Sequence, residues 1–217
     1  MRTVTVGMLE QLALLTALDL LFGLGLWAWA AGLLFAAAVC AALYRARVER
    51  LGPANHVTLA RATLVGGVTA LVVDGAPTPV LVTVASVALA MDAVDGVVAR
   101  RTGTATRVGA RFDLEIDAFL ILVLSVRVAV ALGPWVLAIG AYRYLFVAAS
   151  RPLRWLRRPL PPSRASKAIA ATQGVVLVVA ASDVLPRGLS ITATAVALAA
   201  LTWSFARDVR RLHRDRG

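Results

Sequence analysis

Long apolar runs dominate this chain, and short polar or charged stretches separate them. A helix that crosses the hydrocarbon core of a bilayer needs about 20 mainly apolar residues. Several of the runs reach that length with almost no charge, and proline or glycine stands at most of their boundaries. The pattern predicts six membrane-spanning helices, at residues 54–73, 79–99, 109–132, 134–150, 166–182 and 188–206.

The apolar stretch at residues 9–44 precedes these six helices and does not fit a single span. Its length of about 35 residues is too great for one upright helix and short for two. Gly23 and Gly25 offer a break, so we favour a hairpin of two short spans over an interfacial helix followed by one span at 26–44. The expected division is an N-terminal hydrophobic segment at 1–50 and a six-helix membrane domain at 51–217.

Composition and charge agree with an all-α integral membrane protein. The chain is 59% hydrophobic, its mean hydropathy is +0.79 and its net charge is +11. In a soluble protein that charge would suggest a nucleic-acid partner. Here most basic residues gather in four stretches between apolar runs, at 45–50, 100–111, 151–167 and 207–216. The other connections between apolar runs contain one basic residue, Arg187. This alternation follows the positive-inside rule, so it predicts cytoplasmic Arg-rich loops, contact with membrane lipids and no nucleic-acid partner.

Five of the 12 acidic residues lie between positions 92 and 117. Asp92 and Asp95 are three residues apart near the expected cytoplasmic end of the second core helix. Asp113 and Asp117 are four residues apart near the start of the third. Both spacings place the pair on one helix face. Because a short loop joins the two helices, we expect them to be antiparallel neighbours and the four carboxylates to converge.

Converging carboxylates without a counter-charge would repel each other, and each is costly in a membrane unless it is paired, solvated or bound to a cation. Oxygen ligands suit Mg²⁺ or Mn²⁺, or Ca²⁺, and argue against a structural zinc site. Two ions that share these ligands would make a clamp for a diphosphate. A salt-bridge network is the alternative and explains charge balance, but not the regular spacing. Its arginines would be Arg100, Arg101, Arg107 and Arg111.

The residues around the aspartates follow the pattern Asp92-x2-Asp95-Gly96-x2-Ala99-Arg100-x8-Gly109-x3-Asp113-x3-Asp117. This pattern resembles the full motif of the CDP-alcohol phosphatidyltransferase family, with every fixed position filled. A second segment, Asn55-x2-Thr58-x2-Arg61 after Pro53, is similar to the start of the first core helix in that family.

The resemblance implies six membrane helices around a polar cavity that opens to the cytoplasm, in a homodimer. It implies an enzyme of phospholipid biosynthesis that uses Mg²⁺ or Mn²⁺, with two ions expected. The reaction would transfer a phosphatidyl group from CDP-diacylglycerol to a hydroxyl of an alcohol acceptor and release CMP. The expected location is the bacterial cytoplasmic membrane, with the active site facing the cytoplasm.

The resemblance also implies residue roles. Asp92, Asp95 and Asp113 would bind the two metal ions, and Asp117 would be the catalytic base and a further metal ligand. Gly96 would leave room for the cytidine. The nucleotide-binding residues would be Asn55, Thr58, Arg61, Gly96, Ala99, Arg100 and Gly109.

The acceptor is left open by two departures from the patterns of relatives. Asp117 is followed by Ala118, where many relatives that use glycerophosphate or inositol acceptors have a basic residue, and the Ser-Phe-Gly run of many serine-accepting relatives is missing. One alternative is a phosphotransferase that moves a CDP-linked small alcohol onto a lipid alcohol. Two others are a transporter that uses the aspartates for cations and a non-catalytic scaffold. A transporter would need polar residues near the membrane midplane, and here they cluster at one face.

Overall fold

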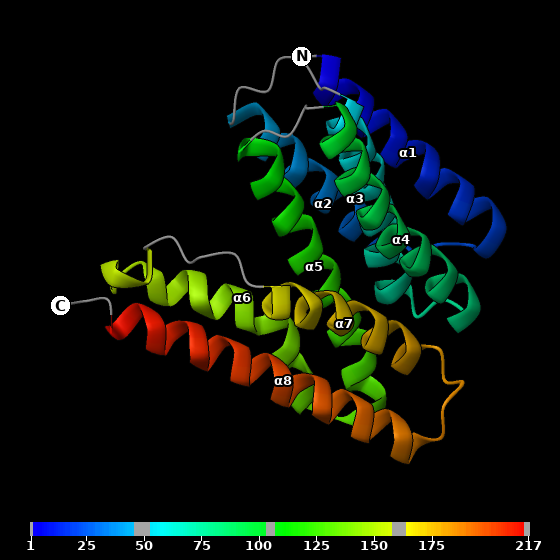
Figure 1. The fold of residues 1–217 in the computed structure, drawn as a ribbon. Helices are drawn as coiled ribbons and strands as arrows, with labels where there is room; N and C mark the ends of the chain where they lie inside the picture. The colour runs from blue at the N-terminus through cyan, green and yellow to red at the C-terminus, as the bar shows by residue number, and fades with distance from the viewer. Residues whose placement is uncertain (1, 46–52, 103–106, 158–163, 215–217) are drawn as a thin grey trace. The chain divides into compact units, whose positions relative to one another are not determined.

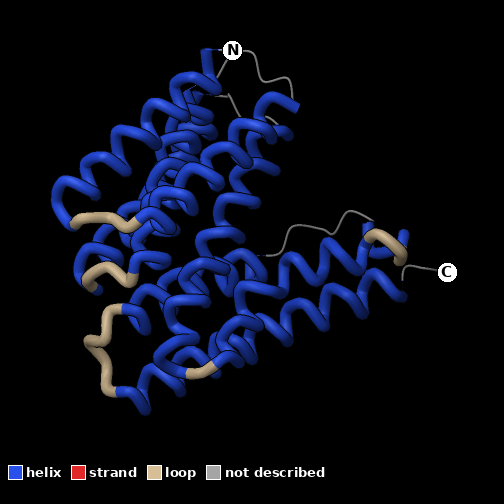
Figure 2. Tube along the Cα trace, turned by 180° about the vertical axis from the view of Figure 1, so that it is seen from behind, coloured by secondary structure: helices blue, strands red, loops and turns tan. Residues whose placement is uncertain are grey.

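The computed structural model describes residues 2–45, 53–102, 107–157 and 164–214, with side chains described for most of them. These residues form eight α-helices and two short 3₁₀ helices, and the described part contains no strand (Figures 1 and 2). The predicted all-α fold is therefore confirmed. The chain divides into two compact units, Met1–Val123 and Leu124–Gly217.

The N-terminal segment forms the predicted hairpin of two helices, α1 (Arg2–Phe22) and α2 (Leu26–Arg45). The break falls at residues 23–25, where Gly23 has a φ of 72°, a conformation that glycine adopts without a steric penalty. The Gly25 N–H donates a hydrogen bond of 2.8 Å to Asp74 Oδ1, which ties the hairpin turn to the end of α3 (Pro53–Asp74). Both hairpin helices are long and apolar enough to cross a membrane.

Helix α3 packs against the hairpin through small residues. A Cβ atom built on Gly66 would lie 2.3 Å from Gln11 Oε1, and one on Gly67 would lie 2.8 Å from Leu14 Cδ2. Because these two positions have no Cβ atom, α1 and α3 can approach closely, as helices with small residues do in other membrane proteins. Val65 and Val68 on α3 are fully buried in the same unit.

The other core helices follow the predicted spans with two differences. They are α4 (Thr78–Thr102), α5 (Arg107–Leu132), α6 (Leu137–Ser150), α7 (Arg164–Ala181) and α8 (Arg187–Arg214). The fourth span begins with a 3₁₀ turn, η1 (Pro134–Val136), before α6. Helix α8 continues to Arg214, past the predicted end at residue 206, because its last turns are amphipathic. Leu212 is buried there, while Arg210 and Arg211 are exposed. The loss of apolar character marked the end of the span and not the end of the helix.

Among the described residues, four helices meet the length and hydropathy expected of a span: α1, α2, α3 and α8. The apolar part of α4 stops at Asp92, and that of α7 covers Ala168–Ala181. Helix α5 carries Asp113, Glu115 and Asp117 along its first turns, so charge lowers its apparent suitability for a bilayer. In α4 and α5 the departure from an apolar pattern therefore falls where the aspartates lie.

Helices α6, α7 and α8 belong to the second unit and are joined by polar contacts. The Gln173 side chain on α7 donates a hydrogen bond of 3.0 Å to the Ala197 carbonyl on α8. The Tyr142 hydroxyl on α6 donates one of 2.7 Å to Thr202 Oγ1 on α8. The Phe205 ring packs against the Tyr142 ring at a centroid distance of 5.1 Å. These contacts hold α8 along its length.

Candidate metal and nucleotide site

Three of the four predicted carboxylates meet in the first unit. Asp92 comes from α4, and Asp113 and Asp117 come from α5. One carboxylate oxygen of each lies within 4.8 Å of the others. The spacing of four residues places the two α5 aspartates on one face, as predicted. Their side chains are 45%, 29% and 36% exposed in chain order, so the cluster is accessible to a ligand.

A buried arginine lies among these carboxylates. Arg61 on α3 is 1% exposed, and its Nη1 is 2.6 Å from Asp92 Oδ1. Its Nη2 is 2.9 Å from Asp117 Oδ1, pairs with Asp113 Oδ1 and donates a hydrogen bond of 3.3 Å to the Asp113 carbonyl. The three carboxylates therefore have a counter-charge, and the sequence analysis did not assign it to Arg61. One guanidinium on α3 joins acidic side chains of α4 and α5.

Arg61 pairs with all three carboxylates of the cluster. Three oxygen donors within 4.8 Å of one another are also a ligand set that a divalent cation can use. The donor set contains only oxygen, so it fits Mg²⁺ or Mn²⁺ better than a structural zinc ion. The cluster could therefore hold a metal.

Two further motif residues have described positions beside the cluster. Thr58 is buried on α3, three residues before Arg61 and hence on the same helix face. Gly109 is partly buried on α5, one turn before Asp113. The sequence thus places both within one helical turn of a charged site residue.

The remaining motif residues are located only by their helices. Asp95, Gly96, Ala99 and Arg100 lie in α4, and Asn55 lies in α3, but their side chains are outside the described residues. The same is true of Arg101 and Arg107, which the salt-bridge alternative invoked together with Arg100 and Arg111. The ion pairs that the structure does describe come from a different arginine, Arg61.

The comparisons with known proteins bear on this site directly. The family model for CDP-alcohol phosphatidyltransferase matches residues 51–205, a range that includes the three clustered aspartates and Arg61. The chain belongs to this family. Comparison with curated proteins and with solved structures gives no match. Family membership makes the chain a transferase and an integral membrane protein, and the hairpin helices α1 and α2 precede the matched range.

The sequence reading identified Arg61 as a motif residue but missed its partners. A signal for them was present: an arginine inside an apolar run needs an acidic partner, because an unpaired charge is costly in a bilayer. The next two helices carry the clustered aspartates: Asp92 lies 31 residues and Asp113 52 residues further along the chain, and Asp117 follows Asp113 by one helical turn. The salt-bridge alternative could therefore have included Arg61 among its arginines.

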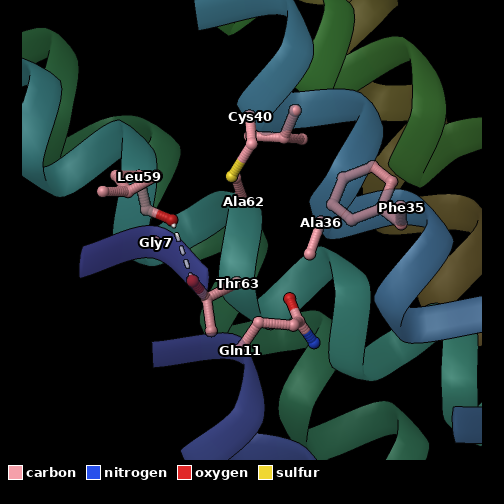
Figure 3. A pocket seen from close by; sticks show the side chains of 9 residues that line it. Gly7, Gln11, Phe35, Ala36, Cys40, Leu59, Ala62 and Thr63 are labelled. Atoms are coloured by element: carbon pink, nitrogen blue, oxygen red, sulfur yellow. Dashed lines mark hydrogen bonds between the residues drawn. The ribbon is translucent and has the colours of Figure 1, made fainter. Parts of the chain in front are cut away.

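A shallow pocket in the same unit has a different character. It lies between α1, α2 and α3, and Gln11, Cys40 and Thr63 are its polar or sulfur-containing side chains (Figure 3). Thr63 Oγ1 donates a hydrogen bond of 3.2 Å to the Leu59 carbonyl. The lining contains no charged residue, so this pocket is not a candidate for binding a nucleotide diphosphate.

Proposed function

We propose that this enzyme transfers a phosphatidyl group from CDP-diacylglycerol to a hydroxyl of an alcohol acceptor and releases CMP, as a step of phospholipid biosynthesis. The observation that carries the proposal is the meeting of Asp92, Asp113 and Asp117 around Arg61 within the family's matched range. Such a site has the charge and donor atoms to bind a metal–diphosphate unit. We place it at the cytoplasmic face of a bacterial membrane, because the Arg-rich connections lie on that side under the positive-inside rule.

The metal ligands in this proposal are Asp92, Asp113 and Asp117, and Asp95 is expected to join them. We expect two ions of Mg²⁺ or Mn²⁺. When bound, such ions neutralise charge on the diphosphate and on the oxygens that enter and leave at phosphorus. The all-oxygen donor set described above supports this assignment.

Asp117 has the role of general base. Its carboxylate is 36% exposed and lies 2.9 Å from the Arg61 guanidinium. A base must lie within hydrogen-bonding reach of the proton it accepts, and a partly open carboxylate beside the diphosphate site meets that need. The acceptor oxygen forms a new bond to the lipid-side phosphorus, the bond from that phosphorus to the CMP oxygen breaks, and Asp117 accepts the hydroxyl proton.

Positioning accounts for much of the rate in phosphoryl-type transfer, because the reacting oxygens must be aligned with phosphorus. Thr58 and Arg61 on α3 would hold the nucleotide side, together with Asn55. Residues of the α4–α5 motif would complete the nucleotide pocket: Gly96, Ala99, Arg100 and Gly109. A homodimer, as expected from the family resemblance, belongs to the same proposal.

Release of CMP tests the proposal. The purified full-length protein is incubated with CDP-diacylglycerol, Mg²⁺ or Mn²⁺ and a panel of alcohols, and CMP is measured by chromatography. We expect CMP release that requires both the metal and one acceptor and that stops when EDTA is added. Asp19→Asn, on α1 outside the matched range, serves as a control and should leave the rate unchanged.

A parallel reaction distinguishes the alternative donor. Here a CDP-linked small alcohol replaces CDP-diacylglycerol, and diacylglycerol is the acceptor. CMP release only in this reaction would replace the proposed donor and acceptor with those of a phosphotransferase. Folded protein that released no CMP from either donor, with divalent ions present, would refute the proposal. A cysteine at position 104 tests the orientation: a membrane-impermeant reagent should label it only from the cytoplasmic side.

A further inference from the structure

The carboxylates that Arg61 contacts are the carboxylates that a metal would use. Its guanidinium pairs with Asp92 Oδ1 at 2.6 Å, with Asp117 Oδ1 at 2.9 Å and with Asp113 Oδ1. The same three carboxylates each offer one oxygen to the candidate metal site. An arginine and a divalent cation would therefore share, and compete for, this group of carboxylates.

We infer that Arg61 is a positioning residue that links metal binding to binding of the substrate's diphosphate. In the metal-free enzyme, Arg61 holds the three carboxylates together. When cations take their share of the carboxylate oxygens, the guanidinium is released toward the diphosphate as its new anionic partner. This inference rests on the proposed function. The sequence analysis expects Arg61 only to line the nucleotide pocket; we add that Arg61 competes with the metal for the carboxylates and then pairs with the diphosphate.

Electrostatics supports the competition between Arg61 and the metal. Carboxylates within 4.8 Å of one another repel, and the Arg61 guanidinium can bond to several of them because its N–H groups form a planar fork. A neighbouring positive charge also weakens the attraction of the same carboxylates for a cation. Arg61 thus keeps the site assembled and at the same time lowers its affinity for metal.

The burial of Arg61 supports its transfer from the carboxylates to the diphosphate. Arg61 is 1% exposed, and its neighbours on α3 include Leu59, Ala62 and Val65, all buried and apolar. A buried guanidinium that loses part of its ion pairing is costly unless another anion replaces it. The diphosphate brings negative charge to the side of Arg61 that faces the cluster. Metal and nucleotide therefore bind cooperatively, with the guanidinium as the shared element.

A purely structural salt bridge makes the opposite prediction for metal binding. If Arg61 only joined α3 to α4 and α5, its removal would loosen the cluster and weaken binding of both metal and nucleotide. If Arg61 competes with metal, its removal strengthens metal binding and weakens nucleotide binding. The two effects have opposite signs, so direct binding measurements separate the two roles without an activity assay.

The experiment uses the full-length protein in phosphatidylcholine nanodiscs, with Mn²⁺ binding followed by electron paramagnetic resonance and CDP binding by calorimetry. For Arg61→Gln we expect the Mn²⁺ dissociation constant without nucleotide to fall about tenfold, the order given by loss of one unit charge near the ion. We expect the CDP dissociation constant at saturating Mn²⁺ to rise about tenfold or more. Arg127→Gln is the matched control, because Arg127 pairs with Asp183 at 3.8 Å in the second unit, and its constants should equal those of the wild type.

Arg61→Lys keeps the test decisive if Arg61→Gln does not fold. Lysine retains the charge but not the planar fork, so it cannot reproduce the three-way bridge. We expect its Mn²⁺ affinity to lie between those of the wild type and Arg61→Gln, and its CDP affinity to be several times weaker than wild type. A folded Arg61→Gln that bound Mn²⁺ no more tightly than wild type, or an Arg61→Lys with wild-type CDP affinity, would overturn the inference alone. A wild-type protein that bound neither Mn²⁺ nor CDP would overturn the proposed function as well.

Discussion

Two arginines, one in each compact unit, have their charges stabilised in different ways. Arg61 on α3 is 1% exposed and pairs with three carboxylates from α4 and α5. Arg207 on α8 is 21% exposed, donates a 2.8 Å hydrogen bond to Ser166 Oγ, and lies 4.9 Å from the Trp203 ring. It also pairs at 3.6 Å with Asp208, the next residue in the chain.

The difference teaches which charge needs acidic partners from other helices. Arg207 draws on residues of its own helix, on a hydroxyl of α7 and on partial exposure, which is how arginines near membrane interfaces are commonly accommodated. Arg61 depends on acidic groups of two later helices, the first of them 31 residues away in sequence, and these groups meet only in the folded protein. Such an arrangement is costly to build, so it marks a functional site more strongly than an interfacial arginine does.

The largest expected effect comes from the carboxylates around Arg61. Asp117→Asn keeps the shape of the side chain but removes the base and one negative charge, so we expect the rate of CMP release to fall by a factor of about 10² to 10⁴. Asp92→Asn should instead act mainly by weakening Mn²⁺ and CDP binding. Asp208→Asn, which changes the carboxylate beside Arg207, is the control and should stay within about twofold of wild type. Full activity in Asp117→Asn would show that the base is another group.

The next effect concerns the packing that seats α3 against the N-terminal hairpin. Gly66→Leu would place a bulky side chain where a single Cβ already comes within 2.3 Å of Gln11. We expect a loss of about 1–3 kcal/mol in stability from this overpacking, seen as a lower unfolding temperature in detergent. Gly188→Ala on α8 is the matched control, because a Cβ there meets nothing within 4 Å. Equal unfolding temperatures for the two variants would mean that α3 does not need this close approach.

The smallest effect is expected at Arg207. Arg207→Gln removes an interfacial hydrogen bond and the contact with Trp203, for which we expect a loss of less than about 1 kcal/mol in stability and CMP release within about twofold of wild type. Thermal unfolding and the CMP assay measure the two quantities. A tenfold loss of activity with normal folding would place Arg207 in the reaction and remove the contrast with Arg61.

Most of the fold could be predicted from local patterns, because a bilayer forces each span to be long and apolar. The break at Gly23 and Gly25 was visible in the same way. The end of α8 was not, since its last turns are held by one buried side chain, Leu212, in an otherwise polar stretch. A hydropathy pattern predicts which residues can cross a membrane. It does not predict how far a helix continues beyond the membrane.

Local patterns likewise predict only part of the candidate site. Helical spacing predicted that Asp113 and Asp117 share a face, and the antiparallel arrangement of α4 and α5 predicted that Asp92 approaches them. The position of Arg61 depends on how α3 packs against both helices, which no local pattern encodes. The acceptor is undetermined for a similar reason, because its recognition depends on side chains that only the assembled cavity brings together.

The distance along the chain between Arg61 and its partners has a consequence for how the protein is made. Asp92 follows Arg61 by 31 residues and Asp113 by 52. A ribosome that adds 5–20 residues per second needs about 3–10 s to synthesise the longer interval. Over that interval the nascent α3 carries a positive charge whose acidic partners are made one after another, while the hairpin of α1 and α2 is already complete. Entry of α5 into the membrane is therefore the biosynthetic step that completes the neutralisation of α3.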